Sequence, residues 1–314
     1  MLDSTSKALF HALAKSDVLK KIASRYGMRH AASFARRFVA GETVGDAIDA
    51  ARAVQARGMA ITLDLLGERV SSLEDADAAT RRCIAAIEAI TESGIERNLS
   101  LKLTQLGLDV DKASAIDNLR KILERAEPAG FFVRIDMENS PYTDVTLEIV
   151  EMLWGHGHRS IGVVLQSALL RSEQDLARVC TLGARVRLVK GAYKEPKAIA
   201  YQHKADVDAA FSRMLKVLIP SGLHPAIATH DPAMIALAQR VAREHDVARD
   251  GFEFQMLYGI RRDLQAALAK DGYRVRVYIP FGTDWFPYFM RRLGERPANV
   301  AFVLRGIWAD SGSG

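Results

Sequence analysis

The chain has 314 residues, 49% hydrophobic and 26% charged, and its 43 basic against 38 acidic residues give a net charge of +5. This composition excludes an intrinsically disordered protein, and the chain is long enough to form one large hydrophobic core or two small ones. Because the basic residues are spread along the chain without a basic run or interleaved aromatics, the charge argues against nucleic acid as a partner and for an acidic ligand or an anionic membrane surface.

The two cysteines, Cys83 and Cys180, lie in helical-looking segments with neither CxxC spacing nor a nearby Cys/His cluster. We predict reduced packing residues and no metal site. The sequence shows no secretory signal and no run of eighteen apolar residues, so we expect a cytoplasmic protein.

In chain order, residues 1–58 are predicted to form an N-terminal helical arm, whose last helix covers 43–57 and ends at Gly58. Its apolar stripes contain Leu9, Leu13, Ile22, Phe34 and Phe38. The first 22 residues are amphipathic, and packing against the main domain is favoured over contact with a membrane surface.

From residue 59 onwards, eight short β-rich runs recur, and each of the first seven is followed by a segment with helical spacing of apolar residues. The runs are 59–63, 99–103, 131–135, 161–165, 186–189, 225–229, 252–256 and 273–278. This rhythm predicts an α/β fold, a (β/α)8 TIM-type barrel over residues 59–308, with a disordered tail at 309–314. An open doubly wound sheet is the competing fold, but the GxGxxG turn expected after its first strand is absent.

Polar residues are dense near the predicted strand ends, where the active site of such a barrel lies. They are Lys102, Asp136, Glu138, Gln166, Arg187, Lys190, Tyr193, Thr229, His230, Glu253, Gln255, Arg274, Arg276 and Tyr278. One or two could be satisfied polar groups of the core, as a lone histidine often is. Their occurrence on seven neighbouring strands favours a shared ligand site instead.

The fifth run holds two of these charges, Arg187 and Lys190, within or at the end of an apolar strand. A charge there is costly unless it is paired, either with a neighbouring carboxylate or with an anionic or electron-poor ligand. Gly191 directly after the strand favours the ligand, because a glycine lets the backbone approach it closely.

The last unit, residues 283–297, is predicted as a helix whose Tyr288, Arg291, Arg292 and Glu295 share one face. Two arginines over a barrel mouth could clamp a carboxylate, although a solvated charged face with an Arg–Glu pair is commoner and is favoured by position alone. The sequence has no nucleophile elbow, HExxH or P-loop. A cationic, aromatic pocket of this kind does redox chemistry only with a cofactor.

At these residues the sequence resembles the monofunctional bacterial proline dehydrogenases, whose catalytic domain also occurs in the bifunctional proline utilisation proteins. The matching segments are LSLKLTQLGLD (99–109), VRIDMENSPYT (133–143), GVVLQSALLR (162–171), VRLVKGAYKEP (186–196), ATHD (228–231), FEFQMLYGI (252–260) and VRVYIPFGTDWFPYFMRRLGERP (275–297). The resemblance implies a distorted barrel with the last helix over its mouth and a non-covalent FAD.

The resemblance also implies roles for individual residues. Arg187 would lie beside flavin N5, with Asp136 and Tyr193 bracing the catalytic site. The remaining cofactor contacts would come from Gln166, Val189, Lys190, Gly191, Ala228, Thr229, His230 and Gln255, and Glu295 would pair with the arginine clamp. Substrate contacts would come from Lys102, Arg291 and Arg292 on the carboxylate, and from Leu188, Tyr278 and Tyr288 around the ring.

The implied reaction is the oxidation of L-proline to Δ1-pyrroline-5-carboxylate, the first step of proline catabolism to glutamate, by hydride transfer to the flavin. A membrane quinone would reoxidise FAD, which is compatible with peripheral contact with the inner membrane, and a separate pyrroline-5-carboxylate dehydrogenase would use the product. The alternatives are a hydroxyproline dehydrogenase, another FAD barrel such as methylenetetrahydrofolate reductase, and a barrel that binds flavin without catalysis.

Overall fold

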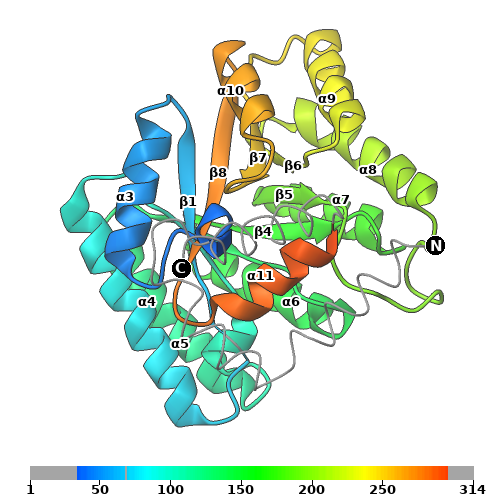
Figure 1. The fold of residues 1–314 in the computed structure, drawn as a ribbon. Coiled ribbons are helices and arrows are strands. Elements are labelled where there is room, and N and C mark those ends of the chain that lie inside the picture. The colour runs from blue at the N-terminus through cyan, green and yellow to red at the C-terminus, as the bar shows by residue number, and fades with distance from the viewer. Residues whose placement is uncertain (1–33, 68, 296–314) are drawn as a thin grey trace.

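The computed structural model describes residues 34–67 and 69–295, with side chains of the last helix described as far as Arg292. Within them, eight parallel strands pair in sequence order and β8 returns to β1, closing the barrel (Figure 1). The strands are β1 (Ala60–Leu65), β2 (Asn98–Leu101), β3 (Phe132–Ile135), β4 (Ile161–Gln166), β5 (Arg185–Val189), β6 (Ala226–Ala228), β7 (Glu253–Leu257) and β8 (Arg274–Phe281). The predicted barrel is therefore confirmed, and each predicted strand overlaps an observed one.

The helices form a layer outside the ring of strands (Figure 1). They are α3 (Val44–Gln55), α4 (Leu73–Ser93), α5 (Lys112–Ala126), α6 (Thr143–Gly155), α7 (Ser172–Leu182), α8 (Lys204–Leu218), α9 (Pro232–Glu244), α10 (Arg262–Lys270) and, in a different place, α11 (Trp285–Glu295). Short 3-10 turns are η1 (Phe34–Arg37), η2 (Leu103–Leu106), η3 (Ser140–Tyr142) and η4 (Ile219–Ser221).

Local sequence explains where these helices begin and end. At the start of α4, the Ser72 side chain accepts a hydrogen bond from the Asp75 amide, and Gly94 ends the helix with a φ of 73°. Thr43 and Asp46 form a capping box for α3, close to the predicted start of that helix. The apolar faces of the outer helices pack on the strands in one continuous core.

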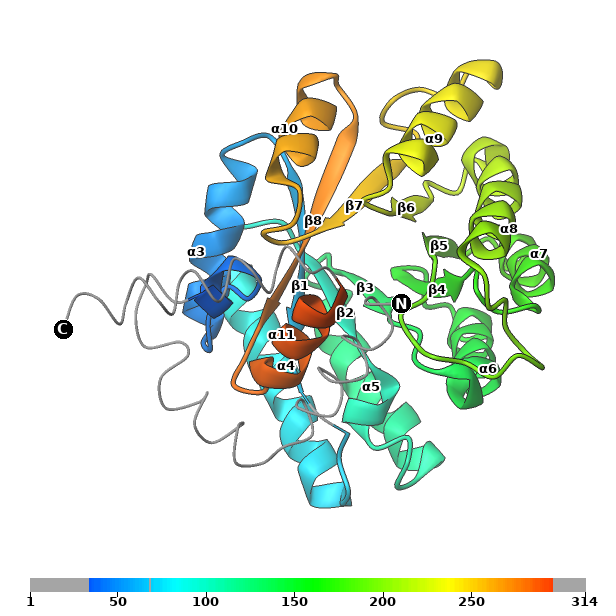
Figure 2. The same ribbon diagram turned by 45° about the vertical axis from the view of Figure 1, so that its right-hand side comes forward.

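Two helices depart from the simple alternation. The helix α3 contacts β1 and β8 from outside, and it therefore covers the part of the barrel that a helix after β8 would otherwise cover. The helix α11 lies instead across the carboxyl-terminal end of the strands, inside the circle of outer helices (Figure 2). The last helix therefore lies over the mouth, as expected.

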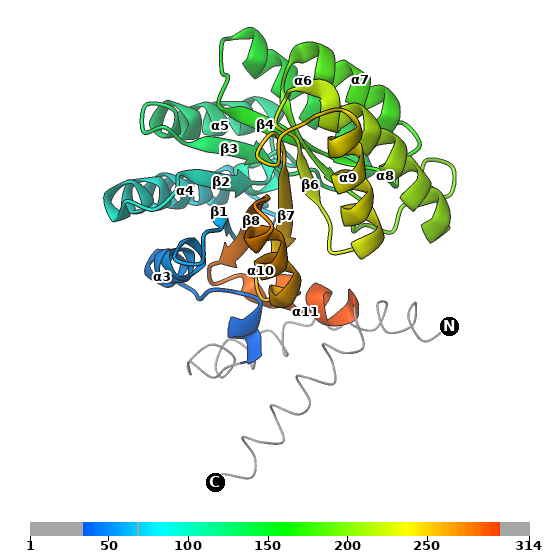
Figure 3. The same cartoon turned by 90° about the horizontal axis from the view of Figure 1, so that it is seen from above.

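A second, smaller hydrophobic cluster holds α11 in this position. It consists of Ala35, Phe38, Val39, Leu66, Trp285, Phe286, Tyr288, Phe289 and Met290. In addition, Trp285 Nε1 donates a hydrogen bond to Glu42 Oε1 at 3.0 Å. The segment around η1 and the mouth helix are thus packed side by side although they lie about 250 residues apart in sequence (Figure 3).

Some predictions concern residues outside this description. Residues 1–33 and 309–314, predicted as most of the helical arm and as the tail, lie outside the described residues. The division of the chain at residue 58 stays a prediction. None of the described helices has the length and apolar character needed to cross a lipid bilayer.

Candidate active site

A cavity of about 600 Å³ opens at the carboxyl-terminal ends of the strands, beneath α11. Its lining brings together most of the side chains that the sequence singled out: Lys102, Asp136, Gln166, Arg187, Val189, Lys190, Gly191, Tyr193, Ala228, Thr229, His230, Gln255, Tyr278, Tyr288, Arg291 and Arg292. Among the residues that the structure describes, seven lysines and arginines and three aspartates line it. Because cations outnumber carboxylates, the cavity favours an anionic ligand.

Arg187 lies at the base of this cavity and is only 5% exposed. Its guanidinium donates three hydrogen bonds: to Asp136 Oδ1 at 2.6 Å, to Gln255 Oε1 at 2.5 Å and to Ser100 Oγ at 3.0 Å. It also stands 5.2 Å from the centre of the Tyr278 ring. Partners on several strands therefore fix both its position and its orientation.

Asp136 joins Arg187 to two further groups of the cavity. Tyr278 donates its hydroxyl hydrogen to Asp136 Oδ2 at 2.8 Å, and Lys102 Nζ lies 3.7 Å from the same oxygen. Burial, followed by the nearby Asp136 carboxylate, raises the pKa of Tyr278 well above its ordinary value. Tyr278 therefore remains a neutral hydrogen-bond donor at neutral pH.

Sequence reasoning missed Asp64, which lines the cavity and is 1% exposed. Lys102 Nζ donates a hydrogen bond to Asp64 Oδ1 at 3.1 Å. Although burial lowers the pKa of Lys102, the charges of Asp64 and Asp136 outweigh it and raise that pKa above its ordinary value. The signal was present in the sequence, because Asp64 is a carboxylate near the end of an apolar strand, like Asp136.

Charged groups also surround the carboxyl-terminal end of β5. Lys190 Nζ lies 2.6 Å from Asp208 Oδ1 and 2.7 Å from Asp231 Oδ2, and Lys204 contacts the same two carboxylates. Arg261, at the start of α10, also lines the cavity. Lys204 begins α8, and Arg261 lies in the loop between β7 and α10, so both stand beyond the strand ends and reasoning from the strand ends did not find them.

Gly191 supplies room for a ligand next to these charges. Its φ is +114°, and a Cβ there would stand 3.2 Å from Ala168 Cβ and 3.3 Å from Gln166 Oε1. Gln166 Nε2 donates a hydrogen bond to the Glu138 carbonyl oxygen at 2.8 Å. This contact fixes the side-chain amide so that Gln166 Oε1 faces Gly191. Any other residue at position 191 would therefore have a strained backbone, and its side chain would crowd Ala168 and Gln166 at the cavity wall.

Thr229 and His230 continue this wall after β6. Thr229 Oγ1 accepts a hydrogen bond from the Asp231 amide at 3.1 Å, and His230 Nε2 accepts one from the Leu257 amide at 3.0 Å. Because an imidazole nitrogen that accepts is unprotonated, the Leu257 contact favours the neutral tautomer of His230. Tyr193 lines the same cavity, and burial raises its pKa.

The helix α11 brings Tyr288, Arg291 and Arg292 to the opposite side of the cavity. The Arg292 guanidinium lies 5.1 Å from the centre of the Tyr288 ring. Arg291 Nε is buried and has no hydrogen-bond partner among the described residues. A buried guanidinium nitrogen without an acceptor favours an anionic group from a ligand.

Two residues predicted near the site, Leu188 and Glu138, do not line the cavity, and the prediction for a third, Glu295, stays a prediction. Leu188 is fully buried in the main core and does not line the cavity, because it alternates with Arg187 and faces the helices. We therefore do not retain it as a wall of the substrate site. The side chain of Glu295 lies outside the described residues. Glu138 is buried and bonds to Thr104, and burial raises its pKa.

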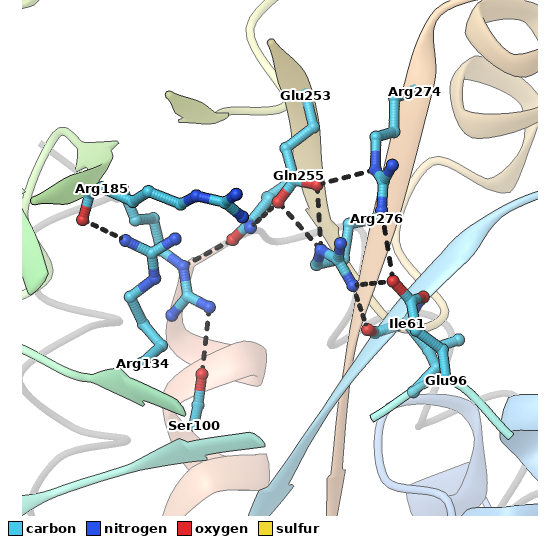
Figure 4. A network of polar contacts seen from close by, with 10 residues as sticks. Ile61, Glu96, Ser100, Arg134, Arg185, Glu253, Gln255, Arg274 and Arg276 are labelled. Carbon is cyan, nitrogen blue, oxygen red and sulfur yellow. Dashed lines mark hydrogen bonds and ion pairs between the residues drawn. The ribbon is translucent and has the colours of Figure 1, made fainter. Parts of the chain in front are cut away.

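Three polar residues predicted near the active site lie at the opposite end of the barrel. Glu253 begins β7 and Arg274 begins β8, with Arg276 two residues further along, so all three belong to the amino-terminal half of their strands. They form an ion-pair network with Glu96 (Figure 4). The prediction that they lie at the mouth was wrong, because it did not consider which end of the run each residue occupies.

The protein-family model described as "Proline dehydrogenase" matches residues 47–305. The chain is 43% identical over 299 residues to proline dehydrogenase 1 of Bacillus subtilis strain 168, covering 95% of this chain and 98% of that protein. It is also 44% identical over 279 residues to the proline dehydrogenase of Deinococcus radiodurans, covering 88% and 90% of the two chains.

Among solved structures, the fold is similar to that of proline utilization A (PutA) from Bdellovibrio bacteriovorus, crystallised after inactivation by N-propargylglycine. The TM-score is 0.79 at 26% sequence identity. The match covers 88% of this chain and 34% of the longer PutA chain. This chain therefore resembles about one third of the PutA chain.

Proposed function

This chain belongs to the proline dehydrogenase family, and we propose that it oxidises L-proline to Δ1-pyrroline-5-carboxylate with bound FAD and passes the electrons to a quinone. The observation that carries the proposal is one cavity lined by two kinds of arginine. Arg187 is buried at its base and donates three hydrogen bonds, and Arg291 and Arg292 of α11 line it from the mouth. Such a cavity can hold an electron-poor ring and a carboxylate face to face.

The lining fits FAD, which carries a diphosphate and a flat ring that becomes more electron-rich on reduction. Lys190 and Lys204, which pair with Asp208 and Asp231, and Arg261, which pairs with Asp263, would offer N–H donors for the anionic part. Gly191 leaves space for close approach of the ring system or its chain. Arg187 would stabilise negative charge on the ring. The remaining cofactor contacts that we propose are Gln166, Val189, Ala228, Thr229, His230 and Gln255, all of which line the cavity.

We assign substrate binding to the mouth helix and to the neighbouring strand ends. Arg291 and Arg292 would hold the proline carboxylate, because guanidinium groups bind carboxylates through two parallel hydrogen bonds. Tyr278 and Tyr288 would enclose the ring, and Lys102 would add positive charge near the carboxylate. Asp136, already bonded to Arg187 and Tyr278, would brace the catalytic site with Tyr193.

In this reaction the ring carbon next to nitrogen loses a hydride and the nitrogen loses a proton, which leaves a carbon–nitrogen double bond. FAD, when bound, supplies the two-electron acceptor. The protein's own residues orient the substrate, and α11 above the cavity limits the access of water. No covalent intermediate with the protein is needed.

A quinone as the final acceptor would be membrane-bound, and we propose a cytoplasmic protein in peripheral contact with the inner membrane. The excess of basic residues supports attraction to an anionic membrane surface. The product would pass to a separate pyrroline-5-carboxylate dehydrogenase.

One spectrum tests the central proposal. Purified protein reconstituted with FAD should be yellow, and L-proline added under argon should bleach the flavin absorbance. Hydroxyproline and NADH, added separately in place of proline, should bleach it more slowly. Protein that remains colourless after reconstitution, or that is bleached fastest by NADH, would exclude the proposed activity.

A further inference from the structure

The side chain of Gln255 lies between two charged groups inside the barrel (Figure 4). Its Nε2 donates a hydrogen bond to Glu253 Oε1 at 2.5 Å, and its Oε1 accepts one from Arg187 Nε at 2.5 Å. Gln255 is 4% exposed, so water does not compete freely for either contact. One amide therefore connects the ion-pair network at the amino-terminal end of the barrel with the base of the cavity.

The two neighbours determine which way this amide points. Arg187 is only a donor, and an ionised Glu253 is only an acceptor. Burial alone would raise the pKa of Glu253, but Arg276 and the hydrogen bonds from Arg276 and Gln255 outweigh it and lower that pKa to about 2. Glu253 is thus ionised at neutral pH. The reverse orientation of Gln255 would set an NH₂ group against Arg187 and an oxygen against the carboxylate.

We propose that Glu253 is a positioning residue for Arg187, acting through the side-chain amide of Gln255. The inference rests on the proposed function, in which Arg187 lies beside the cofactor. Glu253 does not line the cavity and touches neither ligand in this proposal. Its effect on the reaction is to keep the Gln255 oxygen on Arg187 Nε and so to limit the positions that the guanidinium can adopt.

Glu96 offers a matched control within the same network. It pairs with Arg276 at 2.9 Å and with Arg274 at 3.3 Å, whereas Glu253 pairs with the same two arginines at 2.8 and 3.3 Å. Replacing either acid by glutamine removes one negative charge from the same arginines. Of the two, only Glu253 contacts Gln255.

The test compares Glu253→Gln with Glu96→Gln in the full chain. A glutamine at 253 can donate as well as accept, so Gln255 no longer has one fixed orientation. We expect Glu253→Gln to lower the limiting rate of flavin reduction by proline about tenfold or more, since small misplacements of a reacting group are costly. The Kd of the apoprotein for FAD should rise about threefold or more. Glu96→Gln should change both quantities by less than about twofold.

A double-mutant cycle separates positioning from general damage to the fold. In an Arg187→Met background, Glu253→Gln should cause no further loss in the reduction rate, because the group that it positions is absent. Should Glu253→Gln fail to fold, Glu253→Asp replaces it. The shorter carboxylate withdraws from Gln255 by roughly one carbon–carbon bond, ~1.5 Å, but keeps its charge near Arg276. We expect the same lower rate.

Two results would overturn the inference: equal behaviour of the Glu253 and Glu96 variants, or an undiminished loss from Glu253→Gln in the Arg187→Met background. The proposed function fails by a different result, the absence of bleaching when proline is added to the unmodified holoprotein. In that case the FAD affinities of the two glutamine variants still test the link from Glu253 to Arg187.

Discussion

The two ends of the barrel each carry a cluster of charged side chains, but the clusters differ in how their charges are used. At the amino-terminal end, Glu96 and Glu253 are each shared by Arg274 and Arg276. At the carboxyl-terminal end, lysines and arginines outnumber aspartates around a cavity. The four charges of the first cluster balance one another, whereas the described lining of the cavity carries an excess of positive charge that favours an anionic ligand.

The difference shows that a charge within an apolar strand does not by itself identify a functional site. In a closed parallel barrel, position along the strand decides whether the residue reaches the mouth or the opposite end. Each cluster nevertheless contains a deeply buried arginine, since Arg187 and Arg276 are 5% and 4% exposed. The two clusters should therefore respond differently to the same kind of substitution.

The largest effect on stability is expected at the amino-terminal end. Arg276→Met leaves two carboxylates without their closest cationic partner, and the free energy of unfolding should fall by about 3–5 kcal/mol. Urea unfolding measures it. Arg274→Met is the control, since the side chain of Arg274 is 51% exposed and pairs with the same two acids. It should lower the free energy of unfolding by less than about 1 kcal/mol. Equal losses of unfolding free energy in the two variants would show that the burial of Arg276 does not strengthen its ion pairs relative to those of Arg274.

At the cavity end, Arg187→Met should act mainly on the reaction. Removing a fixed positive group beside the developing charge should slow flavin reduction by roughly 10²–10³-fold, as measured by rapid mixing with proline. Arg187→Lys should be intermediate, because it keeps the charge but loses the three-way hydrogen bonding. A reduction rate unchanged in Arg187→Met would place the electron transfer elsewhere.

A smaller effect is expected on the mouth helix. Arg291→Met should raise the KM for proline roughly 10- to 100-fold, the loss expected when a charged hydrogen bond is removed, while FAD remains bound. Steady-state kinetics with an artificial dye acceptor, together with the flavin spectrum, measures both. Arg262→Met is a matched control, because Arg262 does not line the cavity and stacks on Tyr258. An unchanged KM in the Arg291 variant contradicts the carboxylate clamp.

The smallest effect is a pH dependence at the amino-terminal end. The pKa of Glu253 is lowered from 4.5 to about 2 in the folded chain, so its contribution to stability is present above about pH 4.5 and is lost as the pH falls toward 2. Between about pH 6 and 3.5, the stability advantage of the unmodified chain over Glu253→Gln should shrink by roughly 1–2 kcal/mol. Urea unfolding at both pH values tests it. If the stability difference between the unmodified chain and Glu253→Gln is the same at both pH values, the partners of Glu253 do not lower its pKa.

Much of the cavity could be predicted from the sequence, because the carboxyl-terminal ends of parallel strands meet at one end of a barrel. Arg187, Lys190 and Gln166 were found in this way, and the same signal was available for Asp64. Lys204 and Arg261 could not be found, since they reach the cavity from segments outside the strands. Leu188 was misplaced because strand residues alternate between the barrel interior and the helices.

The sequence by itself determined the alternation of strands and helices, and with it the closed barrel and the end at which a ligand would bind. Only the tertiary structure decided which charges face the cavity and which neutralise one another at the opposite end. The reason is that side chains inside a barrel lie in layers set by the register between strands. Two residues on different strands meet only if their layers coincide, and no single strand contains that information.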